Sequence, residues 1–303
     1  MEQITPVKVK LCDVRDDDTF RVSRPVVTDT LIQSVRDLGM LERPFLLDDS
    51  GGLIPFTCHN RILSLRKLEA DKVDAFIIKQ IDPAIFINNT SLKVRRNETG
   101  PAGKCRAFLL AQKHNLYPDT AQFCKKILNV SPDILDAQLA SAVLGLPRQV
   151  RNYVDVKDTG FKILRDLVAL PEYMISWIAY CLDEMQVRAN VFRMVVDYLF
   201  DLGGKNDRVL LPFIDEGMRD DRQLLEVLGR LRYPEYSRLR DQADKLLSSL
   251  SSRGVSVDFP EFFESSRFVV NFDVSVRDSV NDIRERLDRI DAAGLVKLAS
   301  LLK

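Results

Sequence analysis

The sequence lacks the cysteine patterns of a disulfide-bonded or zinc-binding protein. It has five cysteines, an odd number, and they are scattered without a C-x-x-C pair: Cys12, Cys58, Cys105, Cys124 and Cys181. This arrangement excludes a disulfide framework and the usual zinc-ligand spacing, and it favours reduced thiols in a cytoplasm.

Long apolar runs and an excess of either charge are also missing. No apolar run approaches the roughly 20 residues that span a bilayer, and the N-terminus has no signal-peptide pattern. We therefore expect a cytoplasmic protein with no membrane partner. The net charge is zero, so the chain as a whole is not built for nucleic acid. Residues 1–60 sum to about −3 and residues 61–113 to about +6, which places any polyanion site in the second stretch.

What remains is typical of a soluble globular protein of the α+β class. The chain has 303 residues, 46% of them apolar and 29% charged, enough for two or three domains. Alternating or buried-strand patterns occur near the N-terminus, and helical patterns dominate from Pro101 onwards. We expect an α/β domain at 1–99, a helix-turn-helix domain at 100–165, a helical bundle extension at 166–252 and a small α/β unit at 253–303.

Within the first domain, a turn and helix over residues 56–68 carry the clearest chemical pattern. The expected strands are 6–11, 44–47, 53–56 and 73–79, with a helix over 30–38 that Thr28 or Asp29 caps and Gly39 ends. Thr57 is positioned to cap the second helix, so that its free N–H groups and the side chains of His59, Asn60 and Arg61 form an anion site, with phosphate the favoured anion. The alternative is a strand–helix corner whose polar residues simply cap and solvate it.

Two further patterns are weak indications of a catalytic pair and of a phosphate loop. Cys58 beside His59 could pair a nucleophile with a base, but adjacent turn residues seldom face each other and no orienting acid is evident. The segment from Gly100 to Cys105 has too short a spacing for a phosphate loop and no Ser or Thr for magnesium, so a helix started by Pro101 explains it better.

The basic segment 88–97 has two interpretations. It is either a solvated loop between domains or a phosphate clamp built on Arg95 and Arg96, whose forked donors carry a permanent charge.

Residues 118–147 form a helix-turn-helix candidate. One helix starts at 118–120 and runs to Leu128, and a second, over 133–144, is capped by Ser131 with Pro132 in its first position and is stopped by Gly145. The second helix has no Lys or Arg, so phosphate contact would depend on flanking cations. The candidate DNA-binding residues are Lys125, Lys126, Gln138, Ser141, Arg148 and Arg151. The alternative is a helical hairpin that only packs.

Beyond Pro147 the sequence predicts a helical bundle, followed by a last unit that differs in kind. Helical patterns recur at 147–156, 160–169, 171–183, 186–202, 206–217, 221–231 and 235–251, without a fixed repeat period. After a plausible linker at 251–254, strands are expected at 255–259 and 267–274 and helices at 276–290 and 292–302. The alternating segment 268–272 could pair with a second copy to form a homodimer, or close the fold of its own chain.

The order of these elements resembles the ParB family. The segments "SVRDLGMLERPFLL" and "FTCHNRILSLRKLEADKVDAFII" are similar to the N-terminal domain of the ParB/sulfiredoxin fold. "RRNETGPAGKCRAF" resembles the start of the family's next helix, and "TAQFCKKILNVSPDILDAQLASAVLGLPRQVRNYV" its helix-turn-helix. The resemblance covers about residues 5–170.

The resemblance implies a nucleoside-triphosphate pocket, with CTP favoured and Mg²⁺ as its companion, that operates a DNA clamp. The nucleotide-binding set expected from the resemblance and the local pattern is Gly39, Thr57, Cys58, His59, Asn60, Arg61, Arg95 and Arg96. Cys58 stands where the family has a turn glycine, and Leu92-Lys93 stand where it has the Glu-Asn linked to hydrolysis. The resemblance therefore implies nucleotide binding more strongly than hydrolysis.

Three functions follow as hypotheses. The leading one is a nucleotide-binding and DNA-binding protein of the partition or transcription-regulation type. The second is an enzyme, either a small-molecule kinase or an NTPase, that uses the same pocket. The third is an interaction module whose nucleotide site has decayed.

Overall fold

The computed structural model confirms the α+β class. The chain divides into two compact units. The structure describes residues 5–203, 211, 220–251, 256–260, 263–271, 274–288 and 291–302. The units are Met1–Leu225 and Glu226–Lys303. Among the described helices, none is both long enough and apolar enough to cross a membrane.

A four-stranded mixed sheet forms the base of the first unit. Its strands are β1 (Val7–Lys10), β2 (Phe45–Asp49), β3 (Gly52–Pro55) and β4 (Lys72–Ile78), as predicted, in the order β1-β4-β2-β3. β4 pairs antiparallel with β1 and parallel with β2, and β2 and β3 form a hairpin. The C-terminal end of β3 therefore leads directly into the turn that the sequence singled out.

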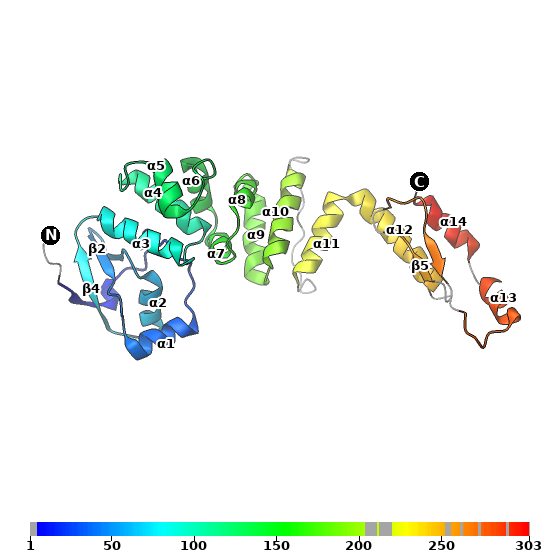
Figure 1. Ribbon diagram of the computed structural model, residues 1–303, viewed down its shortest axis with the longest axis horizontal. Helices are drawn as coiled ribbons and strands as arrows, with labels where there is room; N and C mark the ends of the chain where they lie inside the picture. Colours follow the sequence, from blue (N-terminus) through cyan, green and yellow to red (C-terminus); the bar gives the residue numbers. More distant parts are fainter. Residues whose placement is uncertain are drawn as a thin grey trace. The chain divides into compact units, whose positions relative to one another are not determined.

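Two helices pack together and share an apolar core with the sheet (Figure 1). α1 (Asp29–Leu38) is capped by Thr28, whose hydroxyl accepts from the Leu31 N–H, and ends at Gly39 with φ of 68°. Both features were predicted. α2 (His59–Lys67) follows the turn and buries Ile62 and Leu65. The shared core joins α1 and α2 to the sheet through Val9, Leu11, Val14, Val35, Leu46, Ile62, Leu65, Val73 and Ala75.

The loop interpretation of residues 88–97 is wrong for most of that segment. Residues Pro83–Arg95 form helix α3, whose N-cap is Asp82 and whose first residue is Pro83. Asp82 accepts hydrogen bonds from the N–H groups of Ala84 and Ile85. The polar run Asn88-Asn89-Thr90-Ser91 has low helix propensity, but this cap and the burial of Phe86 outweigh it.

The helices that follow form the rest of the first unit (Figure 1). They are α4 (Pro101–Lys113), α5 (Thr120–Phe123) with a π-helical continuation (Cys124–Leu128), α6 (Ala137–Gly145), α7 (Arg148–Val156), α8 (Phe161–Val168), α9 (Glu172–Glu184) and α10 (Ala189–Gly203). α11 (Asp221–Arg232) begins in this unit. The helical pattern expected at 206–217 lies almost entirely outside the described residues.

One predicted helix start was wrong. α6 begins at Ala137 and not at Asp133, and its cap is Asp136, which accepts from the Leu139 N–H at 2.8 Å. Ser131 does not cap it. Two segments match a helix start, Ser131-Pro132-Asp133 and Asp136-Ala137-Gln138. The helix begins at the second one, and Leu139 and Val143 of this helix are buried in the core.

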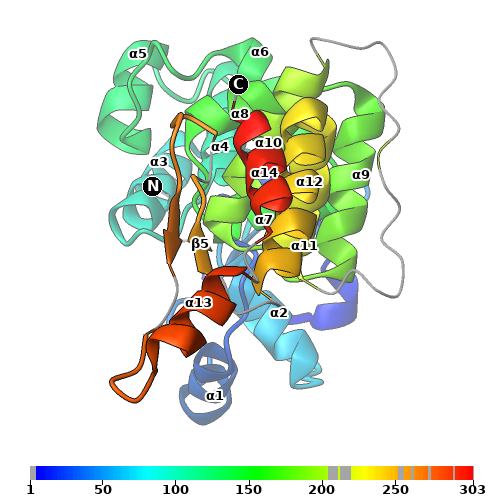
Figure 2. The same cartoon turned by 90° about the vertical axis from the view of Figure 1, so that its right-hand side faces the viewer.

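The second unit is small and contains α12 (Pro234–Ser251), β5 (Ser256–Asp258), β6 (Val269–Asn271), α13 (Val280–Asp288) and α14 (Ala292–Ser300). β5 and β6 pair antiparallel, and α12 packs against both β5 and α14 (Figure 2). The strand–strand–helix–helix order was predicted, although both strands and α13 are shorter than expected. Most of the predicted linker, 252–254, lies outside the described residues.

A buried carboxylate joins α7 to the start of α4. Asp155 Oδ1 accepts from the N–H groups of Ala102, at 2.7 Å, and Gly103, at 3.2 Å, and the Asp155 residue is 5% exposed. A Cβ at Gly100 would lie 2.4 Å from Asp155 Oδ1, and one at Gly103 would lie 2.4 Å from the Val22 oxygen. The two glycines therefore allow this close approach, and the segment is a helix that starts at Pro101, as predicted, and not a phosphate loop.

Replacing Asp155 tests this contact. Asp155→Ala leaves two buried N–H groups without a partner and should lower the free energy of unfolding by about 1–3 kcal/mol in urea denaturation. Asp74→Ala, on an exposed strand position, should have little effect. An equal loss in both variants would contradict the assignment.

Asp155→Asn isolates the charge. Burial raises the pKa of Asp155 to about 6 despite the two N–H donors. The folded protein then binds the proton more tightly than the unfolded chain, so stability from this group falls as pH rises from about 4 to about 6. The free energy of unfolding of the wild type, relative to Asp155→Asn, should fall over this window by on the order of 2 kcal/mol.

Candidate functional site: a cationic cavity at the start of α2

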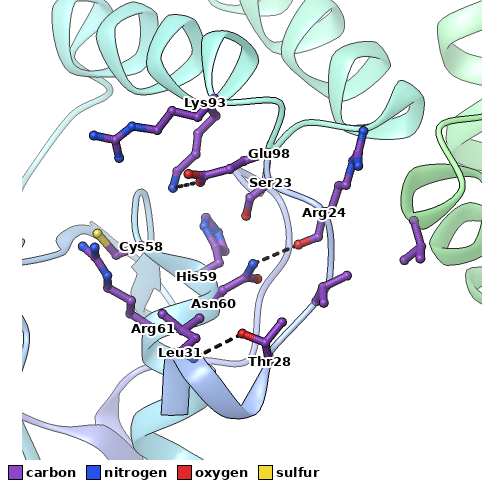
Figure 3. Close-up of a pocket in the computed structure, with 13 residues that line it drawn as sticks. Ser23, Arg24, Thr28, Leu31, Cys58, His59, Asn60, Arg61, Lys93 and Glu98 are labelled. Carbon is purple, nitrogen blue, oxygen red and sulfur yellow. Dashed lines mark hydrogen bonds and ion pairs between the residues drawn. The ribbon is translucent and has the colours of Figure 1, made fainter. Parts of the chain in front are cut away.

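A cavity of about 430 Å³ lies where α2 begins (Figure 3). Four segments of the first unit form its wall: the chain from Ser23 through the start of α1, the turn into α2, the end of α3 with the loop after it, and the end of α7. The lining residues are Ser23, Arg24, Val26, Thr28, Leu31, Cys58, His59, Asn60, Arg61, Lys93, Arg96, Glu98 and Val156.

The start of α2 at this cavity is uncapped by any side chain. Cys58 is the N-cap residue and makes no capping hydrogen bond, and the N–H groups of His59 and Asn60 have no partner among the described residues. Free N–H groups at a helix start carry partial positive charge and bind anions. The predicted Thr57 cap was wrong, because the Thr57 hydroxyl instead accepts from the Phe45 N–H at 2.9 Å and holds the turn against β2.

Cys58 adopts a left-handed conformation, with φ of 58° and ψ of 28°. This backbone favours glycine, which agrees with the sequence-based inference that Cys58 stands in place of a turn glycine. Burial raises the pKa of the Cys58 thiol. A protonated thiol is a poor nucleophile, so burial of Cys58 argues against the Cys58–His59 catalytic pair.

Asn60 positions the wall and does not point a free amide into the cavity. Its Oδ1 accepts from Arg21 at 2.9 Å, and its Nδ2 donates to the Arg24 carbonyl at 2.9 Å. Both ends of the amide are therefore used to hold the chain around Arg24 against α2 (Figure 3).

Four cations line the cavity, and three are paired with carboxylates. Arg61 pairs with Glu42 at 2.6 Å, Arg24 with Asp158 at 3.3 Å, and Lys93 with Glu98. Glu42 and Asp158 are half exposed or more, so an incoming anion could take their places. The pairs Arg61–Glu42 and Arg24–Asp158 therefore mark places for negative groups.

Two lining groups remain available to a ligand: the Arg96 guanidinium and Arg24 Nε. Arg96 makes no ion pair and no side-chain hydrogen bond with any described residue. Arg24 Nε is buried without a hydrogen-bond partner. An orphaned buried donor is costly, and an acceptor oxygen on a bound ligand would satisfy it.

His59 contributes no positive charge to this cavity. Burial, with the nearby cations Arg21 and Arg106, lowers the pKa of His59 to about 3, so the ring is neutral. The Pro55 carbonyl is its backbone hydrogen-bond partner, and Nε2 is buried without one. This arrangement favours a proton on Nδ1 and leaves Nε2 as an acceptor. Such a group suits a hydroxyl or amine of a ligand better than a phosphate.

The structure brings together five of the eight predicted nucleotide-binding residues: Cys58, His59, Asn60, Arg61 and Arg96. Gly39, Thr57 and Arg95 do not line the cavity. Sequence reasoning missed Ser23, Arg24 and Glu98, and it included Lys93 only as a member of the basic segment 88–97. No local pattern distinguished Arg24 from the other arginines of the chain. Its place in the cavity depends on a tertiary contact, the hydrogen bond from Asn60 Nδ2 to the Arg24 carbonyl.

No group of three or more potential metal-ligating side chains occurs in the described part of the chain. The residues therefore do not form an all-protein magnesium site. A Mg²⁺ ion that accompanied a nucleotide would be held largely by phosphate oxygens and water, as is usual for this ion.

The predicted DNA-binding residues lie on the helical part of the first unit. Lys125, Lys126, Gln138, Ser141 and Arg148 are exposed. Arg151 is half-buried and its Nε is buried without a partner, which makes it less suited to a DNA surface. α7 also starts, after Pro147, without a side-chain cap, and Arg148 is its first residue.

No model of a known family matches the chain, and no curated protein matches it. Two crystal structures of the C-terminally truncated chromosome-partitioning protein ParB from Caulobacter crescentus are similar to it. The complex with the centromeric parS site is 10% identical, covers 64% of this chain and 98% of its own, and has a TM-score of 0.30. The complex with CTP-gamma-S is 14% identical, covers 59% and 99%, and has a TM-score of 0.26. Similarity at this level carries no information about function.

Replacing Cys58 with glycine tests the strain in the turn. Cys58→Gly should raise the free energy of unfolding by about 0.5–1 kcal/mol, because glycine adopts the left-handed conformation without a Cβ clash. Cys12→Gly is the matched control. Cys12 lies in a short 3-10 helix with ordinary backbone angles, so this substitution should be neutral or destabilising. Destabilisation by Cys58→Gly in urea denaturation would contradict the prediction.

Proposed function

We propose that this chain binds a nucleoside triphosphate in the cavity at the start of α2, and DNA through α5–α7. The observation that carries the nucleotide proposal is the uncapped start of α2 in a cavity with four cationic side chains. A cavity of about 430 Å³ also lies within the usual size range of small-molecule sites.

The chemistry of the wall supports a polyphosphate ligand. Phosphate oxygens would accept from the His59 and Asn60 N–H groups, from Arg96 and from Arg24 Nε, and would replace the carboxylates that now pair with Arg61 and Arg24. The neutral His59 Nε2 would accept from a ribose hydroxyl or a base amine. CTP is favoured because of the sequence resemblance to the ParB family, which also suggests a partition or transcription-regulation role.

The cavity wall also suggests how nucleotide and DNA binding could be linked. Lys93 and Arg96 come from α3 and its end, and Val156 ends α7, which also carries Arg148. A triphosphate bound between α2 and α3 would fix the spacing of these elements. The proposal also includes a homodimer in which two copies associate through the second unit.

Arg96 and Arg95 provide a matched pair for the nucleotide test. Both are exposed and adjacent, but only Arg96 lines the cavity. With saturating CTP at 100 times its dissociation constant, thermal denaturation of the wild type should show about 2.7 kcal/mol of stabilisation. Arg96→Ala should weaken CTP binding roughly tenfold to a hundredfold by loss of a charge-assisted bond, while Arg95→Ala should not.

ATP and GTP in the same assay test the choice of base. An equal loss of nucleotide affinity in the Arg95→Ala and Arg96→Ala proteins would reject the site. So would the absence of thermal stabilisation of the wild type by any of the three nucleotides. If the wild type releases phosphate from a nucleotide and Arg61→Ala does not, the protein is an NTPase and not only a nucleotide-binding protein.

The DNA proposal is tested by salt dependence. A Lys125→Ala/Lys126→Ala protein should bind duplex DNA more weakly than the wild type in fluorescence anisotropy. The slope of log K against log salt should fall by about 1.8, since each phosphate contact contributes about 0.9. Lys8→Ala/Lys10→Ala, on the exposed side of β1, should leave the slope unchanged. Wild-type protein that does not bind duplex DNA at low salt would reject this half of the proposal.

A further inference from the structure

A second cavity lies on α4, apart from the nucleotide site. It has a volume of about 650 Å³ and shares no lining residue with the cavity at α2. Its wall consists of Thr19, Leu144 at the end of α6, and five residues of α4: Arg106, Leu109, Leu110, Gln112 and Lys113. We call it the α4 groove.

One face of α4 supplies the apolar floor of the groove and the cations at its two ends. Arg106, Leu109, Leu110 and Lys113 follow the spacing i, i+3, i+4 and i+7, which places them in line on one side of a helix. Two leucines therefore form an apolar floor with a cation at each end. The cations are separated by seven residues, or about 10 Å along the axis. Leu144 adds a third apolar side chain, and the lining residues include no acid.

Arg106 is in an unusual state for a buried cation. Its guanidinium donates to the Arg21 carbonyl, but it forms no ion pair with any residue of the described chain. Burial lowers the pKa of Arg106, and although Asp18 and Asp155 oppose this, neither lies within ion-pair distance. A half-buried guanidinium without a carboxylate is costly, so its position at the groove suggests a place for an anionic group from outside.

We propose that the α4 groove binds an acidic amphipathic α-helix of a partner protein. A second helix has the same rise per residue as α4, so carboxylates seven positions apart would match Arg106 and Lys113. The apolar residues between those carboxylates would cover Leu109, Leu110 and Leu144. This is the helix-in-groove mode of peptide recognition, with charge complementarity at both ends.

The test uses two labelled helical peptides that differ in charge alone. The first carries leucines on one face and glutamates seven positions apart beside them; the second has lysine at each glutamate position. In fluorescence anisotropy with the full chain, the glutamate peptide should bind with a micromolar dissociation constant and the lysine peptide should not. Equal binding of both peptides would overturn the proposal.

Charge reversal at the exposed end of the groove sharpens the test. Lys113→Glu should weaken binding of the glutamate peptide at least tenfold and gain binding of the lysine peptide. Lys162→Glu, an exposed lysine on α8 outside the groove, should change neither. Unchanged binding in Lys113→Glu, or the same loss in Lys162→Glu, would overturn the proposal.

A gain-of-binding variant covers the case in which Lys113→Glu does not fold. Gln112→Lys adds a cation at an exposed lining position and should tighten binding of the glutamate peptide several-fold. No tightening would count against the groove. Decanoate and duplex DNA are tested as alternative ligands. If either one binds the wild type and loses affinity in Lys113→Glu, while the glutamate peptide does not bind, the groove does not bind a helix and the proposal is wrong.

Discussion

The first unit depends on a carboxylate buried where two helices meet. Asp155 binds the free N–H groups at the start of α4, and that start in turn lies against the Val22 carbonyl. A charge at 5% exposure is tolerated because these donors and the nearby Arg106 and Arg24 offset its burial. Through this contact the start of α4 holds together two parts of the cavity wall, the end of α7 and the chain before Arg24.

Asn60 has the corresponding role on the other side of the cavity. Its amide holds Arg21 and the Arg24 carbonyl against α2, and Arg21 in turn accepts from Arg106 through its own carbonyl. A short chain of hydrogen bonds therefore runs from the α2 cavity to the α4 groove. The two proposed sites are separate in their lining residues, but they are attached to the same buried polar network, in which each member supports the geometry of the next.

Local rules predicted the sheet, α1 and α2, because each rests on neighbouring residues: alternation in the strands, Thr28 and Gly39 at the ends of α1, and the apolar face of α2. The glycine-like position of Cys58 was expected only from the family resemblance. Local rules failed where two local choices competed or where distant residues decided. Thr57 could cap α2 or bind the Phe45 N–H, and the fold selects the second. α3 was missed because its polar residues resemble a loop. Arg24 reaches the cavity only through tertiary contacts, which no spacing in the sequence reveals.

The paired cations of the α2 cavity have a kinetic consequence. Arg24, Arg61 and Lys93 are each matched by a carboxylate, so of the four cations that line the cavity Arg96 is the one without a carboxylate partner among the described residues, and its field is screened beyond about 8 Å. The three pairs therefore add little to the long-range attraction of an approaching anion. In the proposed complex, selection would take place after entry, when the ligand displaces Glu42 and Asp158 from Arg61 and Arg24. The residence time of the ligand would then depend on how readily those two carboxylates return.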